Sequence, residues 1–223
     1  GLLAWDESAV GPRPGVLVVH EWWGPSEHPH NQARRLAESG YVAFALDMYG
    51  DGKHAMNPDD AGKLAGEATR DPAVVLARFN AGRDVLTADS RVDASRIGAI
   101  GCCFGGMIVL EMARAGLDLD AVASFHGILE TQTPAPPGQV KARVLVLTGA
   151  ADPFAPPQAV EGFRAEMIAA KADFRIVSYP NAKHGFTNPD AAGHGMPEVA
   201  YDADADTQSW REMLTLFGAA LGR

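Results

Sequence analysis

The segment at residues 101–106, Gly-Cys-Cys-Phe-Gly-Gly, constrains the fold of this chain more than any other. It follows an apolar run at residues 97–100 and precedes a helical pattern at residues 107–115. A strand, a sharp turn flanked by glycines and a helix form a nucleophile elbow, whose pattern is Gly-x-nucleophile-x-Gly. The sequence therefore predicts a reactive side chain at the point where a buried strand turns into a helix.

The spacing of the glycines selects one of the two cysteines. With Cys103 in the nucleophile position, Gly101 and Gly105 take the flanking positions, where small residues let strand and helix approach closely. With Cys102 in that position, both flanking residues would be bulky and apolar. The N-terminus of the following helix also favours a thiolate. We predict Cys103 as the nucleophile; the alternative is a glycine-rich turn with two buried cysteines.

Alternating strand and helix patterns predict an α/β fold. Apolar runs indicate buried strands at residues 15–20, 41–46, 97–101, 121–125, 144–148 and 174–179. Helical patterns lie at residues 31–39, 59–69, 72–87, 105–115, 158–170 and 207–221, with Asp71 as an N-cap before Pro72. We expect a mostly parallel sheet with helices on both faces, a three-layer sandwich. Without repeats or long linkers, residues 1–223 are expected to form a single domain.

Composition narrows the possible partners. The net charge of −9 argues against nucleic acid and against an anionic membrane surface. The two cysteines are adjacent, so no disulfide framework is expected, and neither a dinucleotide fingerprint nor a P-loop suggests a cofactor. We expect a monomer or homodimer in the cytoplasm. Because the chain starts at Gly1 without Met, a periplasmic or secreted location stays open.

Two polar residues that follow strands are candidate partners of the cysteine. Ligands of parallel sheets bind beyond the carboxyl ends of the strands. Asp152 follows the strand at residues 144–148, and His184 follows the strand that ends at Tyr179. The order nucleophile, acid, histidine is that of the α/β-hydrolases, in which the histidine is the base and the acid orients it. The alternative interpretation without a catalytic role is that Asp152 only starts a turn and that His184 is an ordinary loop histidine.

The other histidines fit catalysis less well. His20 and His126 end strands and are expected to line the site. His28, His30 and His54 suggest a metal ligand set, but no carboxylate or cysteine stands at a useful spacing. We therefore interpret them as loop residues and predict no metal.

An acidic run near the C-terminus resembles a calcium-binding loop. Asp202, Asp204 and Asp206 have the alternating spacing, but the required glycine at the sixth position is Thr207. We interpret the run as the acidic start of a helix.

Together with residues 20–24, His-Glu-Trp-Trp-Gly, these motifs resemble the dienelactone hydrolase family of α/β-hydrolases. The resemblance rests on the elbow, on Asp152 and on His-Gly-Phe at residues 184–186, and it spans nearly the whole chain. It implies the α/β-hydrolase fold and a carboxyl-ester or lactone hydrolase, similar to carboxymethylenebutenolidase, that needs no cofactor. It also implies a Cys103–His184–Asp152 triad and a thioester acyl-enzyme.

The resemblance assigns roles to three further residues. Glu21 stands where the family has a glutamate that keeps the resting cysteine a neutral thiol until substrate arrives. A nearby carboxylate does disfavour a thiolate, which protects it from oxidation. Backbone N–H groups of Phe104 and Trp22 are implied as the oxyanion hole.

One position departs from the family pattern. Members that hydrolyse dienelactone carry an arginine four residues after the histidine, and here that residue is Asn188. A second arginine is expected among Arg70, Arg78 and Arg83. An asparagine cannot give the charged bidentate contact that binds a carboxylate.

The expected pocket is therefore partly apolar. Trp22, Trp23, Phe104, His126 and Asn188 are its expected lining. The hypothesis is a small neutral or weakly polar ester or lactone as substrate.

Two other hypotheses about the function of the chain compete with the hydrolase hypothesis. A non-hydrolytic redox-sensing or binding domain would also use a reactive Cys103, but it would need no base oriented by an acid. A cysteine peptidase of the papain type would need cysteine, histidine and asparagine spacings that are absent.

Overall fold

The computed structural model describes residues 1–222, apart from the side chain of His194. These residues form a seven-stranded sheet in the order β1-β3-β2-β4-β5-β6-β7. All neighbouring strands are parallel except β1 and β3, which are antiparallel. The strands are β1 (Leu2–Ala4), β2 (Arg13–Val19), β3 (Val42–Leu46), β4 (Val92–Cys102), β5 (Ala121–Phe125), β6 (Arg143–Gly149) and β7 (Phe174–Tyr179).

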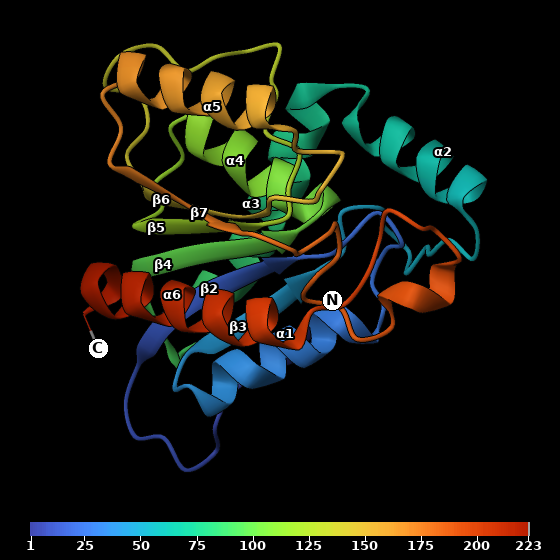
Figure 1. Cartoon of the computed structure of the whole chain (residues 1–223). Helices are drawn as coiled ribbons and strands as arrows, with labels where there is room; N and C mark the ends of the chain where they lie inside the picture. The colour runs from blue at the N-terminus through green and yellow to red at the C-terminus, as the bar shows by residue number, and fades with distance from the viewer. Residues whose placement is uncertain (223) are drawn as a thin grey trace.

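Helices cover both faces of this sheet (Figure 1). α1 and α6 lie on one face, α3, α4 and α5 on the other, and α2 packs against α3. The predicted mostly parallel sheet between helical layers is confirmed. The helices are α1 (Glu27–Glu38), α2 (Pro58–Thr69), α3 (Pro72–Thr87), α4 (Phe104–Arg114), α5 (Pro157–Ala169) and α6 (Ala203–Leu221), with a short 3₁₀ helix, η1, at Ala191–His194.

Each face of the sheet has its own hydrophobic core because side chains alternate along a strand. On β2, Leu17 and Val19 pack with α3 and α4, whereas Val16 and Val18 pack with α1 and α6. All four are fully buried. This two-sided burial explains why the strands read as continuous apolar runs in the sequence.

The ends of several elements differ from the sequence-based expectations. β1 was not predicted, since a three-residue edge strand carries almost no pattern. α1 begins at Glu27 rather than at residue 31, because a proline in the first helical turn lacks only an N–H that has no helical partner there. α6 begins at Ala203 rather than at residue 207, because the Asp202 side chain accepts hydrogen bonds from the N–H groups of Asp204 and Ala205.

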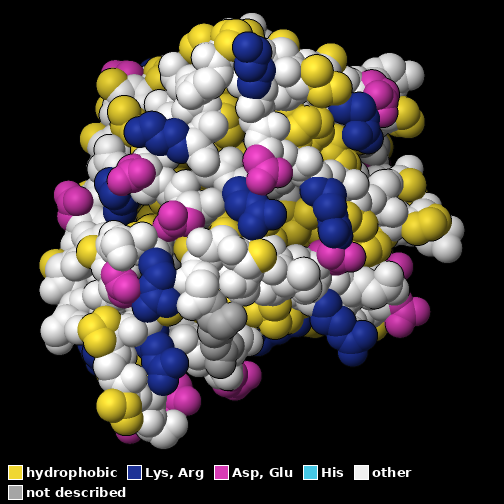
Figure 2. Space-filling model, turned by 90° about the vertical axis from the view of Figure 1, so that its left-hand side faces the viewer, with side chains coloured by type: hydrophobic (Ala, Val, Ile, Leu, Met, Phe, Trp, Pro, Cys, Tyr) yellow, Lys and Arg dark blue, Asp and Glu magenta, His cyan; other side chains and the backbone are white. Residues whose placement is uncertain are grey.

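The face at the amino ends of the strands carries charges of both signs side by side (Figure 2). Arg143 pairs with Asp173 at 3.0 Å, and Arg96 pairs with Asp93 at 2.8 Å. Such partly exposed pairs contribute little to stability individually. None of the helices in residues 1–222 is both long and apolar enough to cross a membrane.

The turn after β4 depends on a close approach of three backbone segments. A Cβ atom added to Gly101 would lie 2.1 Å from the carbonyl oxygen of Gly105. One added to Gly105 would lie 2.2 Å from the carbonyl oxygen of Val19 on β2. β4, α4 and β2 therefore meet at distances that only glycine permits at both positions.

We predict that Gly101→Ala destabilises the protein by about 3 kcal/mol, because the added methyl group collides with backbone that cannot move aside. Gly62→Ala is the matched control. Gly62 lies in α2, and a Cβ atom added there meets open space. Alanine is therefore expected to raise the free energy of unfolding by up to about 1 kcal/mol. Urea unfolding measures both, and equal stability of the two variants would contradict the packing described for the turn.

Candidate active site

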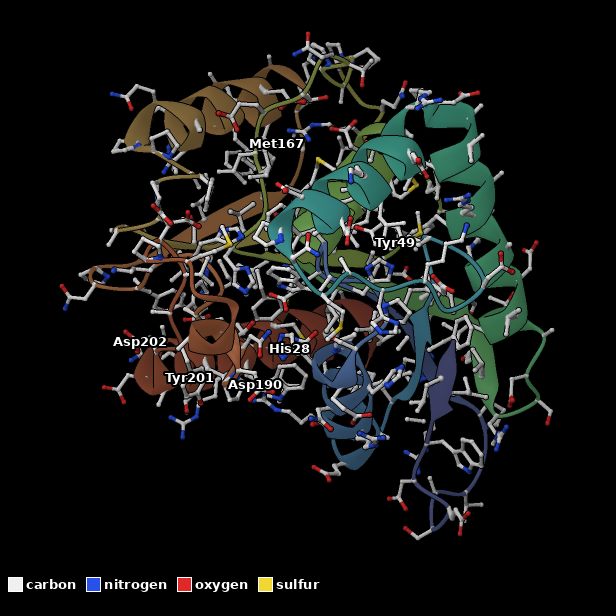
Figure 3. The ribbon with its side chains drawn as sticks, turned by 90° about the vertical axis from the view of Figure 1, so that its right-hand side faces the viewer. His28, Tyr49, Met167, Asp190, Tyr201 and Asp202 are labelled. Carbon is white, nitrogen blue, oxygen red and sulfur yellow. The ribbon has the colours of Figure 1, made fainter. Side chains whose placement is uncertain are left out.

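Four residues singled out from the sequence meet at the carboxyl edge of the sheet. Glu21 follows β2, Cys103 follows β4, Asp152 follows β6 and His184 follows β7. Three of them, Glu21, Cys103 and His184, line one cavity. Asp152 lies behind His184 and contacts its ring nitrogen. Figure 3 views this edge of the molecule.

Cys103 adopts a backbone conformation that non-glycine residues rarely take. Its φ and ψ are 54° and −116°, and it is the N-cap residue of α4. Its N–H donates to the carbonyl of Phe125 at 3.0 Å, which fixes the turn against β5. Strain of this kind costs about 1–3 kcal/mol and persists only where surrounding structure imposes it. The half-buried side chain of Cys103 reaches the cavity wall.

Cys102 faces the opposite side of the strand, away from the cavity. It is 1% exposed, and its Sγ accepts a hydrogen bond from Gln32 Nε2 at 3.0 Å. Burial, with a smaller contribution from the charge of Glu21, raises the pKa of its thiol far above the ordinary value. A buried neutral thiol is a poor nucleophile.

His184 is oriented by Asp152. The His184 Nδ1 atom lies 2.9 Å from Asp152 Oδ2, and the Asp152 side chain is fully buried. The second Asp152 oxygen accepts from the N–H of Phe154 at 2.8 Å. Because a carboxylate only accepts, Nδ1 carries the hydrogen, and Nε2 is left for another partner.

The surroundings favour a protonated His184. Burial opposes the charge most strongly, but the charge of Cys103, followed by hydrogen bonds to Asp152 and Cys103, outweighs it. The result raises the pKa of His184 to about 10. A thiolate at Cys103 and a proton on His184 therefore favour each other.

A buried histidine fixes the loop after β2. His20 Nε2 accepts from the N–H of Met48 at 3.1 Å, so Nδ1–H donates to the carbonyl of Glu21 at 2.6 Å. The Tyr49 hydroxyl donates to the next carbonyl, that of Trp22, at 2.8 Å. Both carbonyls are held, which fixes the segment that carries the expected second oxyanion donor.

The carboxylate of Glu21 is held by Asn188. Asn188 Nδ2 donates to Glu21 Oε2 at 2.7 Å, and the two residues are 5% and 4% exposed. The amide therefore contacts Glu21 and is not part of the wall of the cavity.

The cavity has a volume of about 280 Å³. The ionisable residues of its wall are Glu21, Cys103 and His184, and apolar residues form the rest. The apolar lining consists of Trp22, Trp23, Phe104, Met107, Ile128, Phe154, Met196 and Val199. An apolar wall around a few convergent polar groups is typical of small-molecule sites.

Two residues expected to line the pocket lie outside it. His126 is fully buried, its Nε2 lies 2.9 Å from Thr187 Oγ1, and its ring packs edge-on against that of His184. Asn188 lies behind Glu21. Arg78, one of the candidate substrate-binding arginines, instead donates to the carbonyl of Met48 at 2.7 Å.

Several lining residues were missed by sequence reasoning. Ile128 and Phe154 closely follow β5 and β6, so their position after strand ends was a usable signal. Met196 and Val199 come from the loop between β7 and α6, where no pattern marks them. Tyr49 was not identified as the residue that holds the Trp22 carbonyl.

No cluster suited to a metal ion occurs within the described part of the chain, when groups of three or more His, Cys, Asp or Glu side chains are considered. His28 Nε2 lies 3.3 Å from Thr187 Oγ1, and His30 lies 3.7 Å from Glu27. Asp202 caps α6.

The buried His20 predicts a pH dependence of stability. Burial lowers its pKa to about 4 from 6.5. Between these values the unfolded chain binds a proton that the folded protein does not, so stability is lost as the pH falls from 6.5 toward 4. The contribution of one such group is about 3 kcal/mol.

Urea unfolding between pH 7 and pH 4 tests this expectation. His20→Gln is expected to be less stable at pH 7, because one amide cannot bridge Glu21 and Met48 as the ring does. Its stability should also fall less steeply with acid than that of the wild type. His126 titrates in both proteins, so the difference in slope isolates His20. Parallel curves would refute the assignment.

Comparisons with known proteins agree on one family. Residues 1–221 match the model of the dienelactone hydrolase family. The protein usf of Aquifex pyrophilus is 30% identical over 209 residues, covering 92% of this chain and 87% of that protein.

Two solved structures are similar over 98% of this chain and 91% of theirs. One, named m3DLH, has 38% identity and a TM-score of 0.92. The other, a dienelactone hydrolase-like promiscuous phosphotriesterase from metagenomic libraries, has 39% identity and a TM-score of 0.91. The chain has the α/β-hydrolase fold and belongs to the dienelactone hydrolase family, hydrolases that act on ester bonds.

Proposed function

We propose that this protein hydrolyses small carboxyl esters or lactones through a thioester formed on Cys103. The observation that carries the proposal is the strained Cys103 at the wall of a cavity that also contains His184, itself held by Asp152 at 2.9 Å. A nucleophile, a base and a residue that orients the base are the three parts that acyl transfer requires.

The first half of the reaction transfers the acyl group to sulfur. His184 takes the thiol proton, and the Cys103 sulfur attacks the carbonyl carbon of the ester. The N–H groups of Phe104 and Trp22 stabilise the resulting oxyanion; Phe104 is the first residue of α4, where N–H groups lack helical partners. The C–O bond then breaks, and the alkoxide leaves with the proton from His184.

The second half returns the enzyme to its starting state. His184 takes a proton from water, and the hydroxide attacks the thioester carbon. The C–S bond breaks, sulfur receives the proton from His184, and the carboxylic acid leaves. In a lactone both products stay in one molecule, so a single hydroxy acid is released.

Opposing charges set the reactivity of the resting thiol. His184, held by Asp152, favours a thiolate, as its raised pKa indicates. The Glu21 carboxylate at the same cavity disfavours one. We infer that Glu21 lowers the fraction of Cys103 that is a thiolate in the resting enzyme. A lower thiolate fraction protects the cysteine from oxidation.

The lining supports a substrate of low polarity. Apart from Glu21, Cys103 and His184, its residues are apolar or aromatic, and no Lys or Arg occurs among the described lining residues. An anionic lactone would therefore find no Lys or Arg there, and the protonated His184 is already paired with Asp152. A small neutral or weakly polar ester suits this surface.

The metagenomic relative favours a second candidate substrate class. Its description as a promiscuous phosphotriesterase makes neutral phosphotriesters worth testing here, because they too offer an electrophilic centre without charge.

Hydrolysis of p-nitrophenyl acetate and a panel of lactones tests the proposal. We expect Cys103→Ala and His184→Ala to lose at least about 10³-fold in kcat/KM, since nucleophile and base act as a unit. Cys102→Ala is the matched control, because Cys102 lies outside the cavity; its kcat/KM should stay within about twofold of the wild type.

Equal rates for wild type and Cys103→Ala would refute the proposal. If no ester, lactone or phosphotriester is turned over while Cys103 still reacts rapidly with peroxide, the redox-sensing reading would replace it.

A further inference from the structure

The contact between Asn188 and Glu21 joins two loops that are far apart in the sequence. Asn188 Nδ2 lies 2.7 Å from Glu21 Oε2, and both side chains are buried. Glu21 reaches the cavity wall, whereas Asn188 stays behind it. Asn188 thus touches the site only through the carboxylate that it holds.

The orientation of the Asn188 amide follows from its other partner. Asn188 Oδ1 accepts a hydrogen bond from the backbone N–H of Asp190 at 3.0 Å. A backbone N–H can only donate, so the oxygen must point to Asp190 and the NH₂ group to Glu21. The backbone of Asn188 is fixed as well, since its N–H donates to Gly185 and its carbonyl accepts from Ala191.

Glu21 is therefore fixed at both ends. His20 and the N–H of Gly24 hold its backbone carbonyl at 2.6 and 3.0 Å, and Asn188 holds its carboxylate. The donor on the carboxylate is a neutral amide, so its negative charge is oriented but not cancelled. No Lys or Arg occurs among the described residues of the cavity wall, and the protonated His184 at that wall is paired with Asp152 at 2.9 Å.

We propose that Asn188 is a positioning residue that fixes the uncompensated charge of Glu21 at the cavity wall and thereby makes Cys103 selective against anionic reactants. For ester substrates this inference rests on the proposed function. For the reaction of Cys103 with other reagents it is independent of that function. A charge in a cavity shielded from water acts strongly on a charged molecule that enters it, and the net charge of −9 adds to the repulsion.

Two alkylating reagents of nearly equal size test the proposal. Iodoacetamide is neutral and iodoacetate is anionic. Their rates with Cys103 are measured by mass spectrometry, and the ratio of iodoacetate to iodoacetamide is divided by the same ratio for N-acetylcysteine amide. A change in packing alone would alter both rates together and leave this ratio unchanged.

We expect Glu21→Gln to raise the ratio about tenfold, because it removes the charge and keeps the shape. Asn188→Leu should raise it similarly, since a carboxylate without its donor is no longer held toward the cavity. Should the leucine variant not fold, Asn188→Ser is the alternative, because serine is too short to reach Glu21.

Asp190→Asn is the matched control. It also removes one negative charge near Asn188, but Asp190 is exposed and lines, with His28, a hollow outside the cavity (Figure 3). Its backbone N–H to Asn188 is kept. The ratio should equal that of the wild type.

An unchanged ratio in Glu21→Gln would overturn the charge argument. An unchanged ratio in the Asn188 variants, with a raised ratio in Glu21→Gln, would overturn the role of Asn188. The p-nitrophenyl monoester of glutaric acid and its methyl ester extend the test to turnover. If neither these two esters nor the esters, lactones and phosphotriesters named above are hydrolysed, but the alkylation ratios behave as expected, the proposed hydrolase function fails while this inference stands.

Discussion

The close approach of backbone at Gly101 and Gly105 is the constraint on which the rest of the site depends. It lets the start of α4 pack against the end of β2, and it makes the turn from β4 into α4 very tight. Cys103 accommodates this tight turn by adopting a φ of 54°. The side chain is thereby presented to the cavity, and the helix begins directly beneath it. Cys102, the last residue of β4, instead has its sulfur buried on the opposite face of the sheet.

Around this turn, buried neighbouring residues hold the residues of the cavity wall in place. Asp152 holds His184, His20 holds the backbone of Glu21, and Asn188 holds its carboxylate. Each of these contacts is buried, where a missing partner costs more than it does in water. The side chains that face the cavity are thus preorganised before a substrate enters.

Much of the fold was predictable because its signals are local. α3 has the predicted bounds, since Asp71 caps it and Pro72 occupies its first turn. The elbow was predictable because its glycines stand at fixed spacing. β1 was not, because three residues pairing at a sheet edge leave no periodic pattern. The start of α1 was placed too late, because Pro29 near a helix start gives no certain boundary.

The site was only partly predictable for a related reason. A position after a strand indicates the edge of the sheet, but it does not say which way a side chain points. His126 has a φ of 40° and packs beneath the cavity beside Phe186. Asn188 was expected at the substrate, yet it contacts Glu21, a residue 167 positions away. Such contacts depend on tertiary packing, which spacing in one sequence cannot reveal.

The proposed reaction requires that the strained Cys103 carries the acyl group during turnover. Rapid acid quenching during hydrolysis of p-nitrophenyl acetate, followed by peptide mapping, tests it most directly. We predict a 42 Da acetyl adduct confined to Cys103, formed within the first turnover and lost as substrate runs out (~42 Da is the mass of acetyl replacing hydrogen). Turnover without an adduct on Cys103, or with the adduct on Cys102, would rule out a thioester on Cys103.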